Sequence, residues 1–136
     1  MVGLGTDEVA DGNRFFGIQV TTAGNTIISN TVSGNGRSGL VLSGPEAENN
    51  VVQRNRIGTD STGTVAVGNN AFGILISNSD NNLIGGPQRV DQNIVSGNGG
   101  AGISLGSNSS GNRLERNFIG LDESGTLALA LSLIHI

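Results

Sequence analysis

Short apolar stretches alternate with Gly and Asn along this chain, and they recur in a fixed pattern. The pattern is Gly-Asn-x-x-x-Gly-Φ-x-Φ, in which Φ is apolar. Its four copies are residues 12–20 (GNRFFGIQV), 34–42 (GNGRSGLVL), 68–76 (GNNAFGILI) and 97–105 (GNGGAGISL). Because the apolar positions of each tail are two residues apart, each tail predicts a short β-strand with one buried face. The Gly and Asn residues between the tails are typical of tight turns.

A second motif follows each copy: an Asn, a few apolar residues, and another Asn five positions later. The pairs are Asn25/Asn30, Asn50/Asn55 and Asn112/Asn117. In the remaining copy, Asn81 and Asn93 fit this spacing if residues 85–91 (GGPQRVD) are a seven-residue insertion. Each second Asn leads into a further apolar position, so we expect three short strands in each repeat.

The chain also repeats with a longer period. Residues 58–67 (GTDSTGTVAV) and 120–129 (GLDESGTLAL) match in length, and we call these two segments the excursions. Residues 4–7 (LGTD) look like a shortened third copy. The larger unit is therefore a pair of repeats, residues 12–67 and then 68–129. A single repeat cannot bury its own apolar side chains, whereas stacked repeats can. We predict an all-β solenoid, a parallel β-helix of about five rungs, across residues 1–130.

The repeats resemble those of the pectin-lyase-like superfamily of right-handed parallel β-helices. More narrowly, they are similar to the N-x-I-G-T-D-x-x-G-T repeats of large bacterial secreted or surface proteins. Residues 55–64, 68–76 and 82–86 carry this resemblance, which extends over residues 2 to about 129. It implies right-handed coiling and an extracellular or cell-surface location. It also implies flanking rungs of a parent chain, and extracellular polysaccharide, as partners. It specifies no activity, because the superfamily contains both enzymes and inert stalks.

Both ends of the sequence look unlike natural ends of such a fold. No polar segment that could cap the first rung precedes the repeats, so we expect an uncapped fragment with open strand edges. Residues 131–136 (LSLIHI) match one reading frame of a common sequencing adapter. We interpret them as adapter read-through at the end of a metagenomic fragment, which leaves His135, the one histidine, without meaning.

Charge and composition narrow the classes of partner. The chain has a net charge of −4, with seven Arg and no Lys against eleven Asp and Glu. In sequence the seven arginines are scattered and form no stripe, which disfavours nucleic acid as a partner. The absence of Cys rules out disulfides and thiolate metal sites. No apolar run approaches the length of a membrane span, so we expect no membrane insertion.

The recurrent polar residues have a structural interpretation. Stacked Asn amides can hydrogen-bond from rung to rung, as in other Asn ladders. We predict such a ladder from Asn30, Asn55, Asn93 and Asn117. Recurrent glycines in the strand motif predict tight bends or positive φ angles. They are Gly17, Gly39, Gly73 and Gly102.

The acidic residues of the excursions are the candidates for a metal site. Asp7, Asp60, Asp122 and Glu123 could contribute to Ca²⁺ binding, but Ca²⁺ takes six to eight oxygen ligands. One or two carboxylates in each loop fall short of that number. Asp also commonly begins a turn, so we favour turn formation and expect no cofactor.

We find no catalytic residue in the sequence. Lyases of the superfamily use clustered acids with an Arg or a Lys, and glycoside hydrolysis needs two carboxylates that face each other across a sugar. The outward strand positions that we predict are Gln19, Val41, Leu75 and Ser104, which offer no such pair. The four aromatic residues are phenylalanines, at positions 15, 16, 72 and 118, and we expect them to pack in the core or at corners.

These observations favour a structural or adhesive shaft segment that is not catalytic in itself. Two alternatives remain open. The chain could be a fragment of a polysaccharide lyase or hydrolase, with active rungs elsewhere or with the Asp60 and Asp122 loops in use. It could also be a module that binds Ca²⁺ or glycan through the excursions.

Overall fold

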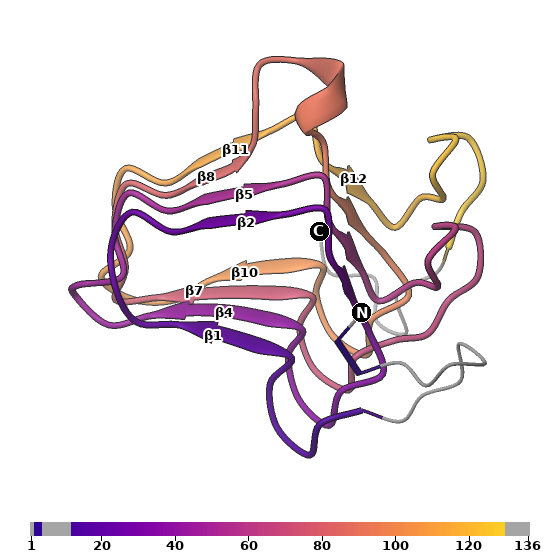
Figure 1. The fold of residues 1–136 in the computed structure, drawn as a ribbon, viewed down its shortest axis with the longest axis horizontal. Helices are drawn as coiled ribbons and strands as arrows, with labels where there is room; N and C mark the ends of the chain where they lie inside the picture. Colours follow the sequence, from indigo (N-terminus) through magenta and orange to yellow (C-terminus); the bar gives the residue numbers. More distant parts are fainter. Residues whose placement is uncertain (1, 4–11, 130–136) are drawn as a thin grey trace.

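The computed structural model describes residues 2–3 and 12–129, which form three parallel sheets of four strands each. The sheets run along the three sides of a cylinder, and the chain passes from one sheet to the next in every turn (Figure 1). The first sheet contains β1 (Ile18–Val20), β4 (Leu40–Ser43), β7 (Ile74–Ser77) and β10 (Ile103–Leu105). The second contains β2 (Thr26–Ile28), β5 (Val51–Gln53), β8 (Leu83–Gly85) and β11 (Arg113–Glu115). The third contains β3 (Thr31–Val32), β6 (Arg56–Ile57), β9 (Ile94–Val95) and β12 (Phe118–Ile119).

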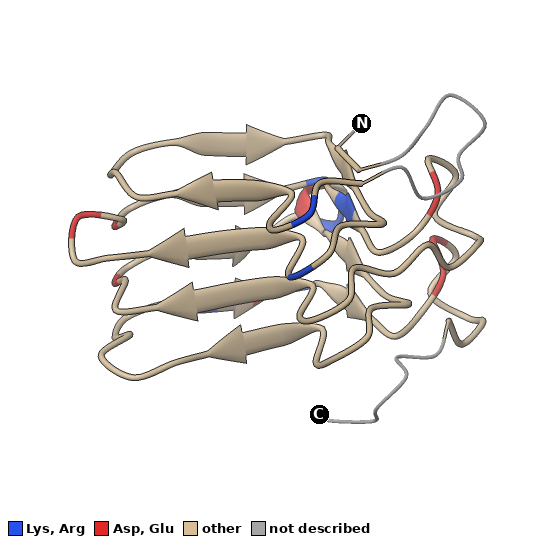
Figure 2. Cartoon of the chain, turned by 90° about the horizontal axis from the view of Figure 1, so that it is seen from below, with Lys and Arg blue, Asp and Glu red and all other residues tan. Residues whose placement is uncertain are grey.

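Three consecutive strands make one rung, and the predicted parallel β-helix is confirmed. The described residues form four complete rungs, β1–β3, β4–β6, β7–β9 and β10–β12, where about five were predicted for residues 1–130. Before the first rung, Val2 continues the cylinder through a parallel bridge to Val32. Figure 2 shows the strands of successive rungs lying one above another.

Apolar side chains repeat at the same register in every rung and form the core. In the first sheet Ile18 pairs with Leu40, Leu40 with Ile74, and Ile74 with Ile103. The inward apolar side chains of the two middle rungs are almost completely buried, because rungs above and below cover them. At the last rung, in contrast, Leu105, Leu114 and Ile119 continue the core positions but are 47%, 39% and 43% exposed.

The insertion in the third rung is one residue shorter than predicted. Asn82, not Asn81, takes the position of Asn50, because the Asn50 side chain donates to Asn82 Oδ1 (3.0 Å). Asn82 and Asn93 are eleven positions apart, whereas Asn50 and Asn55 are five apart, so the insertion adds six residues. Gly85 belongs to β8, and the added residues include the 3₁₀ turn η1 (Arg89–Asp91) that protrudes beside β8 in Figure 1.

The four recurrent glycines of the strand motif are required by close packing rather than by positive φ. None of them is among the described glycines with positive φ. A Cβ on Gly73 would lie 2.4 Å from the Val95 side chain and 2.8 Å from the Asn98 amide nitrogen. Gly39 is enclosed in the same way by an Asn amide and a core aliphatic side chain. All four lie at bends of the backbone, which was one of the two predicted alternatives, and the other alternative, positive φ, is wrong.

The phenylalanines lie nearer the surface than we expected. Phe15 is 56% exposed, with the Arg37 guanidinium 5.5 Å from its ring centre, so its assignment to the core or a corner is wrong. Phe118 is half-buried against Gly125 of the second excursion. The outward position Val41 is 2% exposed, although its side chain is not part of the core cluster.

Candidate functional site

The predicted Asn ladder runs along the corner between the second and third sheets. The Asn30 amide donates to Asn55 Oδ1 (3.2 Å), Asn55 to Asn93 Oδ1 (3.0 Å), and Asn93 to Asn117 Oδ1 (2.8 Å). Each of these oxygens also accepts the backbone N–H of the preceding Asn. These hydrogen bonds join each rung to the next, which is a structural task.

Two further ladders, which the sequence analysis did not assign, occupy the other two corners. One runs through Asn25, Asn50, Asn82 and Asn112, and the other through Asn35, Asn69 and Asn98. Their members are the first Asn of each pair and the Asn of the Gly-Asn motif. The repetition of these residues was the available signal, but it did not reveal that they point inward. Among the described residues no buried side-chain nitrogen or oxygen lacks a partner.

The Asp60 carboxylate closes its own excursion. It accepts hydrogen bonds from the Thr62 hydroxyl (2.8 Å) and from the backbone N–H groups of Thr64 (3.1 Å) and Val65 (3.2 Å). Burial of this carboxylate opposes its ionisation, but the hydrogen bonds outweigh burial and hold the pKa of Asp60 below its usual value of 3.8. An antiparallel bridge between Thr59 and Ala66 completes the loop. Asp60 therefore forms the turn, as predicted.

Asp122 repeats this arrangement in the second excursion. The Ser124 hydroxyl donates to it at 2.6 Å and is the largest influence that lowers the pKa of Asp122. Backbone N–H groups of Leu127 and Thr126 contribute in the same direction, against the effect of burial. The two excursions lie on the same side of the molecule, with their acidic residues in similar places (Figure 2).

Glu123 connects the two excursions. Its carboxylate receives a two-pronged ion pair from Arg56, with Nε at 2.9 Å and Nη2 at 2.6 Å. Its backbone N–H donates to the Gly63 carbonyl (3.0 Å). Since Gly63 and Arg56 belong to the second rung and Glu123 follows the fourth, these contacts bridge the intervening rung.

The candidate Ca²⁺ residues are not gathered into one site within the described part of the chain. No group of three or more Asp, Glu, His or Cys side chains that could hold a metal ion is found among the described residues. Asp60 and Asp122 each accept hydrogen bonds from their own loop, and Glu123 pairs with Arg56. Asp7 lies outside the described residues, as do residues 131–136.

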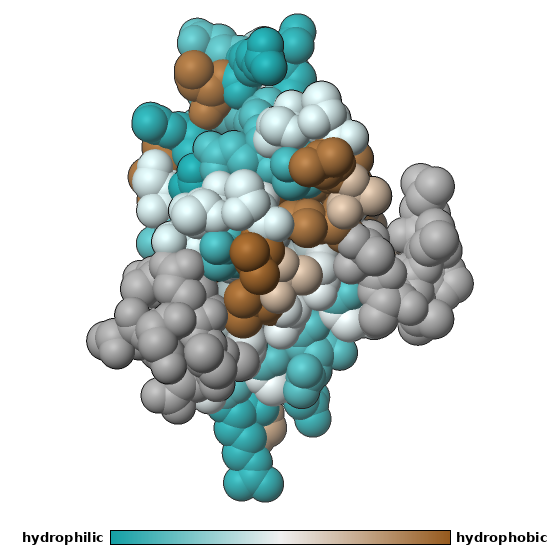
Figure 3. All heavy atoms as spheres, turned by 90° about the vertical axis from the view of Figure 1, so that its right-hand side faces the viewer, coloured by the Kyte–Doolittle hydropathy of each residue, from teal (hydrophilic) through white to brown (hydrophobic). Residues whose placement is uncertain are grey.

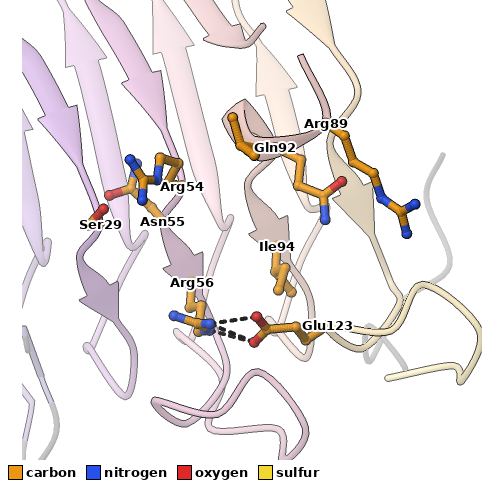
Figure 4. A pocket seen from close by; sticks show the side chains of 9 residues that line it. Ser29, Arg54, Asn55, Arg56, Arg89, Gln92, Ile94 and Glu123 are labelled. Carbon is orange, nitrogen blue, oxygen red and sulfur yellow. Dashed lines mark hydrogen bonds and ion pairs between the residues drawn. The ribbon is translucent and has the colours of Figure 1, made fainter.

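Four arginines that are scattered in sequence come together in space, which corrects the view that the arginines form no cluster. Arg54, Arg56 and Arg89 line a hollow of about 340 Å³, together with Gln92 and Glu123. Figure 4 shows these side chains between the third sheet and the segment that carries η1. A second hollow, of about 410 Å³, shares Arg89 and Gln92 with the first and is also lined by Arg116.

Apolar side chains are exposed on the side that carries the excursions (Figure 3). Val65 and Leu127, at equivalent positions of the two excursions, are 57% and 65% exposed. In the described part of the chain there is no helix long and apolar enough to cross a membrane.

The three stacked parallel sheets, with an Asn ladder at each corner, define a parallel β-helix solenoid. The chain matches the family described as right-handed beta helix region over residues 6–119 and belongs to that family. Its coiling is therefore right-handed, as expected. Comparisons with curated proteins and with solved structures give no significant match.

Proposed function

We propose that this chain is a structural and adhesive shaft segment of a large bacterial secreted or cell-surface protein. In this role it carries neighbouring modules on a stiff cylinder and catalyses no reaction itself. Flanking rungs of the parent chain are its nearest partners, and an extracellular polysaccharide is the ligand for its adhesive surface.

The observation that carries this proposal is the use of the polar residues. Buried amides along all three corners tie one rung to the next, and every buried polar side-chain atom in the described part of the chain has a partner. Such a network resists sliding of one rung over another, because a shifted rung would leave amides unpaired away from water. A shaft needs this property.

The outer face of the first sheet supports a role without catalysis. Gln19, Val41, Leu75 and Ser104 lie in register across the first sheet, and none of them can act as an acid or base in glycoside cleavage. Of the acids in the excursions, Asp60 and Asp122 accept hydrogen bonds from backbone N–H groups of their own loops.

An activity assay on the whole chain tests this proposal. Acidic and neutral polysaccharides are incubated with the protein, with and without Ca²⁺, and new reducing ends and unsaturated sugar products are measured. An authentic polysaccharide lyase serves as the positive control. We expect no product above the level without protein.

Product formation would overturn the proposal and favour the enzyme alternative. A double variant, Asp60→Asn with Asp122→Asn, then locates the chemistry. Activity that disappears in a folded double variant would assign it to the excursion loops. Activity that persists would assign it to other residues of the chain.

A further inference from the structure

The two hollows that share Arg89 and Gln92 form one groove, which we call the arginine groove. It lies over the outer face of the third sheet, beside the insertion that carries η1 (Figure 4). Four of the seven arginines of the chain line it. The chain as a whole has a net charge of −4, so this concentration of positive charge in one surface depression is a local feature that the overall composition does not predict.

The cations of the groove are spread along the axis of the cylinder. Arg54 precedes β6 in the second rung, Arg89 lies on the insertion of the third rung, and Arg116 precedes β12 in the fourth. Neighbouring rungs are about 4.8 Å apart, so Arg54 and Arg116 stand roughly 10 Å apart along the axis. One rung therefore corresponds to about the length of one sugar residue in an extended glycan.

Most of the positive charge of the groove is uncompensated. Arg54, Arg89 and Arg116 have no ion pair with any described carboxylate, whereas Arg56 is paired with Glu123. The paired arginine shows how the groove holds an oxyanion: the guanidinium contacts both oxygens of one carboxylate. Such two-pronged contacts are short and directional, and they suit carboxylates and other oxyanions.

We propose that the arginine groove binds an acidic glycan, a chain of hydroxyl-bearing sugars with carboxylate or sulfate groups. The arginines receive the oxyanions, and the side chains of Gln92 and Ser29 at the same groove offer hydrogen bonds to hydroxyl groups. Nucleic acid fits less well. The chain as a whole is acidic, and Phe118 is the one aromatic side chain lining the groove for bases to stack on. This inference rests on the adhesive part of the proposed function and gives it a location.

Binding of fluorescent oligosaccharides to the whole chain, followed by anisotropy, tests the groove. The probes are a polyuronate oligomer, a sulfated oligosaccharide, a neutral oligosaccharide of equal length and a short single-stranded DNA. We expect the acidic sugars to bind, with affinity that falls as salt is raised. Tighter binding of the polyuronate assigns the groove to carboxylates, and tighter binding of the sulfated sugar assigns it to sulfate esters.

Variants locate the binding. Arg89→Ala and Arg116→Ala should each weaken binding of the preferred acidic sugar about tenfold, through loss of a charge-assisted hydrogen bond. Arg14→Ala, an exposed arginine outside the groove, is the matched control and should bind as the parent does. Glu123→Gln removes the internal carboxylate from Arg56 and should strengthen binding. Thermal melting of each variant identifies any that do not fold.

Several results would overturn the inference. Equal binding of the neutral sugar, equal weakening by Arg14→Ala, or tighter binding of DNA than of either acidic sugar would each do so. Sugar products are measured in the same samples, which separates the two proposals. If no acidic sugar binds, the proposal of a glycan-binding groove fails, but the proposal of a non-catalytic shaft stands. If an acidic sugar binds and products form, the groove stands and the proposal of a non-catalytic shaft fails.

Discussion

Replacement of Asn55 by Ala tests whether the Asn ladders hold the rungs together. Asn55 is 1% exposed and makes four ladder contacts. Its amide nitrogen donates to the Ile27 carbonyl (2.9 Å) and to Asn93 Oδ1 (3.0 Å). Its oxygen accepts the backbone N–H (2.9 Å) and the side chain (3.2 Å) of Asn30. Alanine removes all four contacts, so the Ile27 carbonyl and the backbone N–H and amide of Asn30 each lose a partner, whereas Asn93 Oδ1 keeps the backbone N–H of Asn55.

The magnitude follows from the number of groups left unpaired. A buried polar group without a partner costs about 1–3 kcal/mol, so two or three such groups lower the free energy of unfolding by about 3–5 kcal/mol. That is a large part of the roughly 5–15 kcal/mol that stabilises a typical domain. Asn30→Ala, at the half-buried end of the same column, is the matched control and should cost only about 1 kcal/mol.

Urea denaturation of both variants and of the parent, followed by circular dichroism, measures these differences. Asn55→Asp adds a second arm: it keeps the size of the side chain but replaces the donor with a charged acceptor facing Asn93 Oδ1. It should destabilise at least as much as Asn55→Ala. If Asn55→Ala and Asn30→Ala lower the free energy of unfolding equally, the ladder does not carry the stability that we assign to it.

Three other predictions concern the packing, the excursions and the exposed apolar side chains of the last described rung. Gly73→Ala should destabilise the fold by about 1–3 kcal/mol through overpacking. In the control Gly24→Ala the added Cβ meets no atom within 4 Å, so only the positive φ of this position opposes it and the cost should be about 1–2 kcal/mol. Urea midpoints that fall in the opposite order would contradict the packing. Because folding lowers the pKa of Asp60 and Asp122, their contribution to stability is complete above their unfolded value of 3.8 and is lost as the pH falls through the lower folded values. Urea midpoints measured from neutral pH down to below pH 3.8 should therefore drop in the acid range for the parent and less steeply for Asp60→Asn; equal slopes would contradict this role. The exposed apolar side chains of the last described rung should make the chain self-associate in sedimentation experiments, Leu114→Lys should reduce this association, and a monodisperse parent monomer would refute it.

Much of the fold can be read from the period of the chain. The spacing of apolar residues in the Gly-Asn repeats predicts short strands with one inward face, and the recurrence of five-residue Asn pairs, such as Asn25/Asn30 and Asn50/Asn55, predicts their stacking. These features are local, because a strand pattern and a turn residue depend on a few neighbouring positions. The paired-rung period and the turn-forming role of Asp60 are of the same kind.

Other features depended on register and contact between rungs. The sequence alone could not distinguish Asn81 from Asn82 as the ladder residue, since either fits a loop of uncertain length. It also could not show that Gly73 is required by the approach of Val95 rather than by its own φ, because that approach joins two different strands of the rung.

The arginine groove is the clearest example of a feature that the sequence alone does not predict. The sequence by itself determined a β-helix, because repeated apolar and Asn positions can be satisfied only by stacking one rung on another. Only the tertiary structure decided that Arg54, Arg89 and Arg116 line one groove, since coiling brings together residues that are many positions apart along the chain. Their clustering depends on how long each rung is and where the insertion folds, and no local pattern of residues encodes either of these.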